Sequence, residues 1–153
     1  MANVKEEVER AVSECLHDNG IALESCSYGV FSCSDFGAEG PGIYVFFDDK
    51  NVYYVGEAGD VTRRVLNEHC KARIGGSEGV VRFLMYFLDE ICEKKGEWLD
   101  LDARGREELL RGILRERIGE MRVFVFTCGE LNDPKGRKEL EGCLIEELRP
   151  VLQ

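Results

Sequence analysis

The sequence is short of several features that define whole classes of protein. Its 153 residues contain no run of about 18 apolar residues, so we expect no membrane-spanning helix and no membrane partner. The charged N-terminal segment, MANVKEEVER, has no apolar signal-peptide core, which predicts an intracellular, cytoplasmic protein. Lys and Arg number only 20 against 30 Asp and Glu, giving a formal net charge of −10. A generally adhesive nucleic-acid-binding protein is not expected, because phosphate contacts require positive charge.

Signatures of metal binding and of disulfides are also scarce. The chain has two histidines, His17 and His69, and its seven cysteines include no Cys-x-x-Cys pair. An odd number of cysteines in a chain without secretory features favours buried, reduced thiols over disulfides or a zinc site. The apolar fraction of 44% and the charged fraction of 33% indicate a folded globular protein, and the length suits one domain.

The most informative stretch is residues 42–69, with the sequence GIYVFFDDKNVYYVGEAGDVTRRVLNEH. Two apolar and aromatic runs, Gly42–Phe47 and Val52–Val55, flank the polar residues 48–51, a pattern that predicts a β-hairpin. A small sheet built on this hairpin would present aromatic side chains at regular positions.

Two registers of this hairpin are open, and they differ in where two tyrosines point. A three-residue loop, 48–50, pairs Tyr44 with Tyr54 and puts both side chains on one face of the sheet. A four-residue loop pairs Phe47 with Val52 and puts the tyrosines on opposite faces unless a bulge intervenes. We predict the shared face, with Tyr44 directly opposite Tyr54.

A helix is predicted directly after the hairpin. A turn at Gly56–Gly59 leads to Asp60, a good N-cap, and then to a helix that carries Arg63 and Arg64. Arginine binds phosphate oxygens bidentately, and a phenol can orient or deprotonate a water. Tyrosines on the hairpin and arginines on the next helix therefore suit chemistry on a phosphate.

This stretch resembles the GIY-YIG nuclease family. Gly42-Ile43-Tyr44 matches the first family tripeptide, and Tyr54-Val55-Gly56 matches the second, with Val in place of the usual Ile. Arg64, ten residues after the second tyrosine, stands where the family has its catalytic arginine. A second segment, 140–150 (LEGCLIEELRP), resembles the helix of the excision-repair incision nuclease that carries the metal-binding glutamate, here Glu141.

The resemblance implies a metal-dependent endonuclease that hydrolyses phosphodiester bonds of nucleic acid, with DNA expected. It implies Mg²⁺ or Mn²⁺ as cofactor, with Glu141 as metal ligand. Tyr44 would activate a water, Tyr54 would orient water or phosphate, and Arg64 would bind the phosphate. The type of DNA cleaved, and whether a protein partner supplies targeting, stay open.

The helical pattern alone also supports Glu141 as a metal ligand. At 100° per residue, it falls inside an apolar arc of the predicted C-terminal helix made by Leu140, Leu144, Ile145 and Leu148. A carboxylate facing a core is costly unless it is paired or metal-bound. A buried salt bridge is the structural alternative, and Mg²⁺ suits a single carboxylate because it keeps several waters.

The chain departs from the family pattern at two points. Where the family often has His or Tyr, four residues after the arginine, this chain has Glu68, followed by His69. Three outcomes are open: a change of helix register brings in His69, Glu68 acts as a base or second metal ligand, or activity is lost. Where the family often has Asn after its Arg-Pro pair, this chain has Gln153, whose amide can supply a hydrogen bond.

The net charge of −10 means that a nuclease must gather its cations on one face. We expect nucleic acid to bind a positive patch of Arg63, Lys71 and Arg73 beside Arg64. The patch can be extended by arginines of a later helix, namely Arg104, Arg111 and Arg115. The acidic N-terminal helix, in which Asn3 and Glu6 form a capping box, should lie on the opposite side.

We predict a single α/β (α+β) domain over residues 1–153, with a small, mainly antiparallel three-stranded sheet flanked by helices. Its core comprises 41–70 and 121–153, with an N-terminal extension, 1–40, and a helical insertion, 71–120. The hairpin and a central strand at Met121–Cys128 form the sheet. In the insertion, Gly79–Lys94 is apolar nearly all round, which predicts one buried helix.

Two other functions are compatible with these patterns. The first is a catalytically inactive GIY-YIG-like module that binds nucleic acid or protein, which the acidic balance and Glu68 favour. The second is an acidic protein-interaction domain built on the long helices. An intact Glu141, Arg64 and the two tyrosines oppose the first, because binding alone does not require the inward-facing carboxylate.

Overall fold

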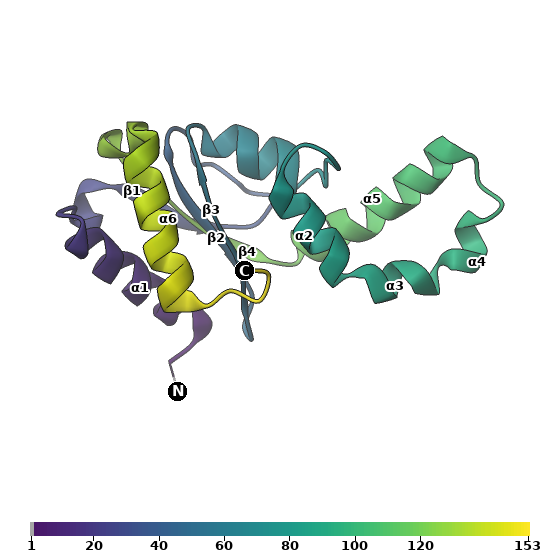
Figure 1. The fold of residues 1–153 in the computed structure, drawn as a ribbon, viewed down its shortest axis with the longest axis horizontal. Helices are drawn as coiled ribbons and strands as arrows, with labels where there is room; N and C mark the ends of the chain where they lie inside the picture. The colour runs from purple at the N-terminus through teal and green to yellow at the C-terminus, as the bar shows by residue number, and fades with distance from the viewer. Residues whose placement is uncertain (1) are drawn as a thin grey trace.

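A four-stranded antiparallel sheet forms the centre of the fold in the computed structural model, which describes residues 2–153 (Figure 1). The strands lie in the order β1-β4-β2-β3. The elements are α1 (Val4–Asp18), η1 (Leu23–Ser25), β1 (Ser27–Phe31), β2 (Gly42–Phe47), β3 (Val52–Ala58), η2 (Thr62–His69), α2 (Glu78–Tyr86), α3 (Leu88–Glu93), α4 (Lys95–Trp98), α5 (Ala103–Gly119), β4 (Arg122–Thr127), η3 (Gly129–Asn132) and α6 (Pro134–Leu148).

The prediction of three strands was wrong by one, because β1 joins the sheet through β4. Tyr28 pairs with Phe126 and Val30 with Phe124 along this edge. Residues 21–33 have the composition of one or two irregular strands, but nothing in the sequence of β1, SYGVF, indicates that it joins the sheet. The prediction that β4 is central is confirmed, because β4 lies between β1 and β2 and is buried from Val123 to Phe126.

Helices cover the two faces of the sheet unequally. On one face, Ile43, Val45, Phe124 and Phe126 pack with α1 and α6. On the other face, a second apolar cluster joins the sheet to η2, α2 and α5 and contains Tyr44, Phe46, Val123 and Val125. The acidic α1, with the predicted capping box of Asn3 and Glu6, therefore lies on the face opposite η2, as expected from the sequence.

The insertion forms a helical arm that projects from the sheet, here called the arm and comprising α2 to α5 (Figure 1). The prediction of one buried helix over residues 79–94 was wrong. The chain breaks at Phe87 into α2 and α3, and Val81, Met85 and Leu88 are exposed. An arm has neighbours on one side only, so an all-round apolar helix cannot be covered there. No helix within residues 2–153 combines the length and apolarity needed to cross a bilayer.

Six of the seven cysteines form disulfides, so the prediction of reduced thiols was wrong for them. The pairs are Cys15–Cys143, Cys26–Cys128 and Cys33–Cys70, with Cα atoms 6.0, 4.8 and 5.6 Å apart. Each pair joins residues at least 37 positions apart, so sequence spacing gave no indication of it. Disulfides are typical of oxidising compartments, and a cytoplasmic location is therefore not confirmed.

The last residues of the chain pair with the outer edge of β3. The amides of Val151 and Leu152 donate to the carbonyls of Val52 and Tyr53. The side-chain amide of Gln153 donates to the Val55 carbonyl and accepts from its N–H, each at 2.8 Å. The side-chain amide of Gln153 therefore satisfies backbone hydrogen-bonding groups of β3.

Candidate active site

The two motif tyrosines share one face of the sheet, as predicted, but through the other register. Phe47 pairs with Val52, and a bulge at Tyr53 restores the alternation, so that Tyr54 lies opposite Phe46 and Tyr44 opposite Gly56. The predicted direct pairing of Tyr44 with Tyr54 was wrong. Their ring centroids are 6.2 Å apart.

The motif glycines make room for close contacts. A Cβ atom on Gly56 would come within 2.3 Å of the Tyr44 hydroxyl oxygen, so the phenol lies directly over the backbone of the second tripeptide. A Cβ atom on Gly42 would meet the Phe126 carbonyl oxygen of β4. Both tripeptides therefore need their glycine for steric reasons. Gly56 is not in a turn as predicted, because β3 continues through it to Ala58.

The helix after the hairpin, η2, is a π-helix, and its register decides which residue reaches Tyr44. Asp60 caps its start by accepting hydrogen bonds from the amides of Thr62 and Arg63. Because a π-helix bonds residues five apart, His69 follows Arg64 on the same face. His69 Nε2 lies 2.9 Å from the Tyr44 hydroxyl in a hydrogen bond. The change of register left open by the sequence is therefore present, and it brings His69 against Tyr44.

His69 is fully buried among aromatic rings. Tyr44, Tyr54, Phe46 and Phe83 surround the imidazole, with ring centroids 5.3 to 6.3 Å away. Burial, together with the charge of the nearby arginine Arg64, lowers the pKa of His69 to about 3. The imidazole is therefore neutral at physiological pH. Its other ring nitrogen, Nδ1, has no hydrogen-bond partner within the described residues.

The phenol of Tyr44 is only 1% exposed, and burial raises its pKa well above 10, with Tyr54 contributing in the same direction. Burial also raises the pKa of Tyr54, followed by the negative charge of Glu141. Both tyrosines therefore carry their protons at neutral pH. Tyr44 meets the neutral His69 as an uncharged hydrogen-bonding pair.

Arg64 is held by Glu68, one turn further along η2. Arg64 Nε lies 3.2 Å from Glu68 Oε2, an ion pair whose geometry falls outside that of a hydrogen bond. The residue Glu68 is only 7% exposed, whereas the Arg64 side chain is 31% exposed. The carboxylate contacts the guanidinium at Nε and leaves the two terminal nitrogens available to a ligand. Arg63, by contrast, is solvent-facing and lies 4.0 Å from Glu68.

Glu141 projects from α6, which covers the sheet face opposite η2 and packs along the edge strand β3. Its charge nevertheless raises the pKa of both Tyr44 and Tyr54, and the Arg64 charge acts in turn on Glu141. The four residues Tyr44, Tyr54, Arg64 and Glu141 therefore lie within electrostatic range of one another, although 77 positions separate the last two in the sequence.

The surroundings of Glu141 fit a divalent cation. The side chain makes no hydrogen bond or ion pair with any of residues 2–153, and burial followed by the charge of Glu57 raises its pKa. A bound cation would offset both unfavourable effects. Among the described residues, no cluster of three His, Cys, Asp or Glu side chains occurs, so the ligands would be one carboxylate and waters. Mg²⁺ accepts such a set.

Two neighbours of Glu141 were missed by the reading of the sequence. Glu57, directly after the second tripeptide, forms a partly buried ion pair with Arg137 of α6 at 2.6 Å. Arg137 also donates to the carbonyls of Leu131 and Asn132. This pair fixes the start of α6 to β3 and so sets the position of Glu141. No pattern within either segment alone indicated it.

The predicted phosphate-binding cations lie near η2 but do not all carry free charge. Lys71 and Arg73 are exposed, and Lys71 Nζ donates to Asn67. On α5, Arg111 donates to the Lys71 carbonyl, and both Arg111 and Arg115 form ion pairs with Glu108. The arm therefore adds little unpaired positive charge beside the site.

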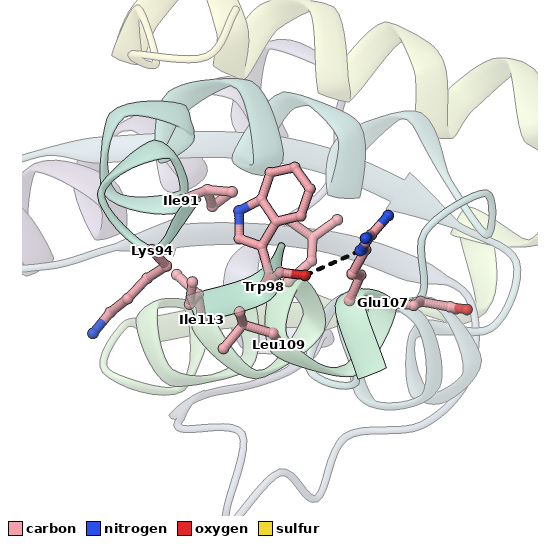
Figure 2. A pocket seen from close by; sticks show the side chains of 8 residues that line it. Ile91, Lys94, Trp98, Glu107, Leu109 and Ile113 are labelled. Atoms are coloured by element: carbon pink, nitrogen blue, oxygen red, sulfur yellow. Dashed lines mark hydrogen bonds between the residues drawn. The ribbon is translucent and has the colours of Figure 1, made fainter. Parts of the chain in front are cut away.

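An apolar cavity of about 240 Å³ lies in the arm between α3, α4 and α5 (Figure 2). Its walls include Ile91, Trp98, Leu109 and Ile113, and Arg106 Nε donates to the Trp98 carbonyl at its rim. None of the predicted catalytic or phosphate-binding residues lines it, so the cavity is separate from the candidate site.

Comparisons of the chain with protein-family models, curated proteins and solved structures found no significant match. The resemblance to GIY-YIG nucleases rests on the motif residues of the sequence.

Proposed function

We propose that the protein is a metal-dependent endonuclease that hydrolyses phosphodiester bonds of nucleic acid, with DNA as substrate. The observation that carries the proposal is the 2.9 Å hydrogen bond between His69 and Tyr44, which depends on the π register of η2. A π-helix is uncommon and is frequently found at functional sites. Here it supports a neutral imidazole and a buried phenol beside Arg64 and Glu141.

In the proposed reaction, Arg64 binds the phosphate that is cleaved. Its Nε is held by Glu68, so the guanidinium keeps one orientation and its terminal nitrogens can contact two phosphate oxygens. Glu68 is a positioning residue in this scheme, because it acts through Arg64 and contacts no reacting atom. Because the phosphate gains negative charge in the transition state, a pre-oriented guanidinium lowers the barrier.

Tyr44 orients the attacking water, and its deprotonated form, the phenolate, accepts the proton of that water. With its proton on Nδ1, neutral His69 accepts the hydrogen bond of the Tyr44 hydroxyl at Nε2, and the lone pairs of the phenol oxygen stay available to a water. Because the pKa of Tyr44 is well above 10, only a small fraction of the phenol is deprotonated at neutral pH. The reaction should therefore accelerate as the pH rises.

Glu141 would hold Mg²⁺ or Mn²⁺ beside the two tyrosines. When bound, the cation neutralises negative charge on the phosphate and on the leaving oxygen. The carboxylate of Glu141 is half-buried and makes no ion pair within the described residues. The ion pair of Glu57 with Arg137 holds α6, which carries Glu141, in place.

Nicking of supercoiled plasmid tests the proposal. The unmutated chain should nick DNA with Mg²⁺ or Mn²⁺ and be inactive with chelator. Glu141→Gln should lose the activity, whereas Glu146→Gln, an exposed glutamate on the same helix, should retain it. Absence of cleavage by the unmutated chain with either cation refutes the proposal.

The low exposure of Tyr44 favours a second candidate, a non-catalytic module that binds nucleic acid or protein. DNA binding measured with Ca²⁺ in place of Mg²⁺ separates the two. Binding without cleavage in Mg²⁺ supports the module, and undetectable binding at low salt supports a protein partner.

A further inference from the structure

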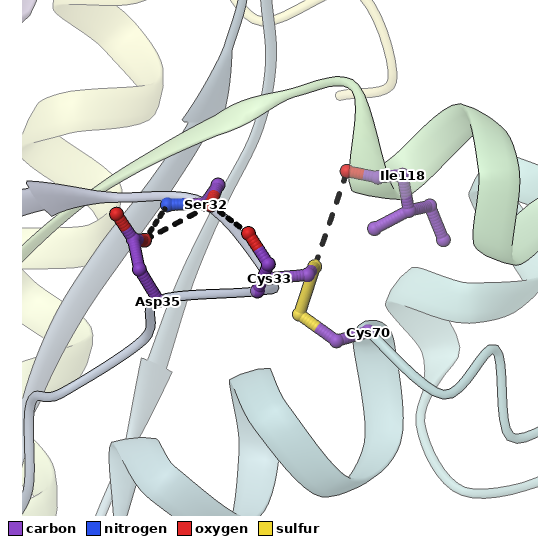
Figure 3. Close-up of a disulfide and its surroundings, with 6 residues drawn as sticks. Ser32, Cys33, Asp35, Cys70 and Ile118 are labelled. Atoms are coloured by element: carbon purple, nitrogen blue, oxygen red, sulfur yellow. Dashed lines mark hydrogen bonds between the residues drawn. A yellow bond between two sulfur atoms is a disulfide. The ribbon is translucent and has the colours of Figure 1, made fainter.

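A loop of the N-terminal extension, residues 32–41, is fastened to both ends of η2. At the start of the helix, Thr62 Oγ1 donates to the Ala38 carbonyl at 2.8 Å, and the Val61 amide donates to the Gly40 carbonyl at 3.0 Å. At its end, Cys70 forms a disulfide with Cys33 (Figure 3). We call residues 32–41 the strap. The covalent attachment comes directly after His69.

The disulfide and the π register depend on each other. The Cys70 amide donates to the Val65 carbonyl five residues earlier, at 2.8 Å, so the π register extends to the cysteine. A change to the α register, at 100° per residue, would turn the end of the helix and carry His69 away from Tyr44. Cys70 would turn with it, away from Cys33.

We propose that the Cys33–Cys70 disulfide is a redox-dependent lock on the π register of η2. In the oxidised form, the lock holds His69 against Tyr44. In the reduced form, the helix relaxes toward the more stable α register and the hydrogen bond between His69 and Tyr44 is lost. The effect on cleavage rests on the proposed nuclease function, whereas the effect on the helix does not.

The chemistry of release requires a thiol reductant. A thiolate attacks one sulfur of the Cys33–Cys70 bond to form a mixed disulfide, and a second thiol of the reductant displaces the protein sulfur. Two protein thiols and one oxidised reductant disulfide result, with two electrons and two protons transferred. The reduced Cys33 has an acceptor within reach, because its sulfur lies 4.0 Å from the Ile118 carbonyl oxygen (Figure 3).

The redox state of the surrounding compartment decides whether the Cys33–Cys70 disulfide forms. In a compartment where thiols keep most cysteines reduced, a single disulfide responds to the redox state of its surroundings. The disulfide would then form, and the site would be complete, only under oxidising conditions. The other two disulfides join α1 to α6 and η1 to the end of β4, on the opposite face of the sheet, and do not contact η2.

The test compares two double variants in a Cys92→Ser background, which removes the exposed unpaired cysteine and prevents thiol exchange. Cys33→Ser/Cys70→Ser removes the lock, and Cys15→Ser/Cys143→Ser is the matched control. Hydrogen exchange of the amides of residues 62–70 is measured with and without dithiothreitol. We expect exchange about tenfold faster in the lock variant and in the reduced parent, and unchanged in the untreated control.

Plasmid nicking under the same conditions should fall about 100-fold on loss of the lock, the size of a typical general-base contribution. Recovery of Cys33 and Cys70 as free thiols from unreduced protein overturns the proposal, as does parental exchange and nicking in the lock variant. If the lock variant fails to fold, reduction and alkylation of the folded parent gives the same comparison. If the parent never cleaves DNA, the nuclease function fails, and hydrogen exchange alone decides on the lock.

Discussion

The burial of His69 predicts a loss of stability in mild acid. The unfolded chain binds a proton at an ordinary imidazole pKa of about 6.5. In the folded protein, the pKa of His69 is about 3. Between these values the unfolded state binds more protons, so the free energy of unfolding falls as the pH drops below 6.5.

The size of the effect follows from the two pKa values. The value of pH 5 lies about 1.5 pH units below the imidazole pKa of the unfolded chain, so protonation stabilises the unfolded state by about 2 kcal/mol. The folded state gains almost nothing from protonation at this pH. With a urea dependence of about 2 kcal/mol per molar, the unfolding midpoint should shift by about 1 M. Above pH 6.5 the contribution is fully retained.

The assay is urea unfolding at pH 8 and pH 5, with the disulfides intact, for the unmutated chain and for His69→Gln. Between pH 8 and pH 5, the free energy of unfolding of His69→Gln should fall by about 2 kcal/mol less than that of the unmutated chain, whatever the stability of the variant at pH 8. The matched control is His17→Gln, because His17 is exposed on α1, on the opposite face of the sheet from His69. An identical pH dependence in the unmutated chain and His69→Gln would refute the assignment of His69 as a buried, neutral imidazole.

Four further predictions concern the candidate site. The logarithm of kcat for nicking should rise with slope one from pH 6 to pH 9, without an inflection near 6.5, because the pKa of Tyr44 lies above this range. Gly56→Ala should cost about 1–3 kcal/mol in thermal unfolding and most of the activity, because its methyl group would overlap the Tyr44 phenol. Glu68→Gln should lower kcat about 10- to 100-fold with little change in KM, since it frees Arg64 without removing it; an unchanged kcat contradicts a positioning role. Arg73→Ala should reduce the salt dependence of DNA affinity by about one contact while leaving kcat unchanged.

Local patterns identified the elements that form the site. The two apolar and aromatic runs in residues 42–55 indicated the hairpin, and Asp60 indicated the start of the next helix, which it caps. These features are determined by neighbouring residues, so a single sequence contains them. The position of Glu141 on its helix followed from periodicity, whereas Tyr44 and Tyr54 were identified by the two tripeptides.

Features that depend on distant contacts could not be derived in the same way. The bulge at Tyr53 sets the hairpin register, and this residue contacts the distant Leu152 and Tyr86. The π register of η2 depends on packing of His69 among aromatic rings from three elements and on the bond to Cys33. Strand β1 requires β4 as a partner. In each case the deciding partner lies elsewhere in the chain.

The attachment of the last three residues to β3 has a consequence for how the protein behaves in solution. Without Val151, Leu152 and Gln153, the outer side of β3 would present a row of unpaired amides and carbonyls at Val52, Tyr53 and Val55. Such a row is a template for pairing with another molecule. The C-terminal residues therefore protect against edge-to-edge aggregation, and shortening the chain by three residues would promote concentration-dependent self-association.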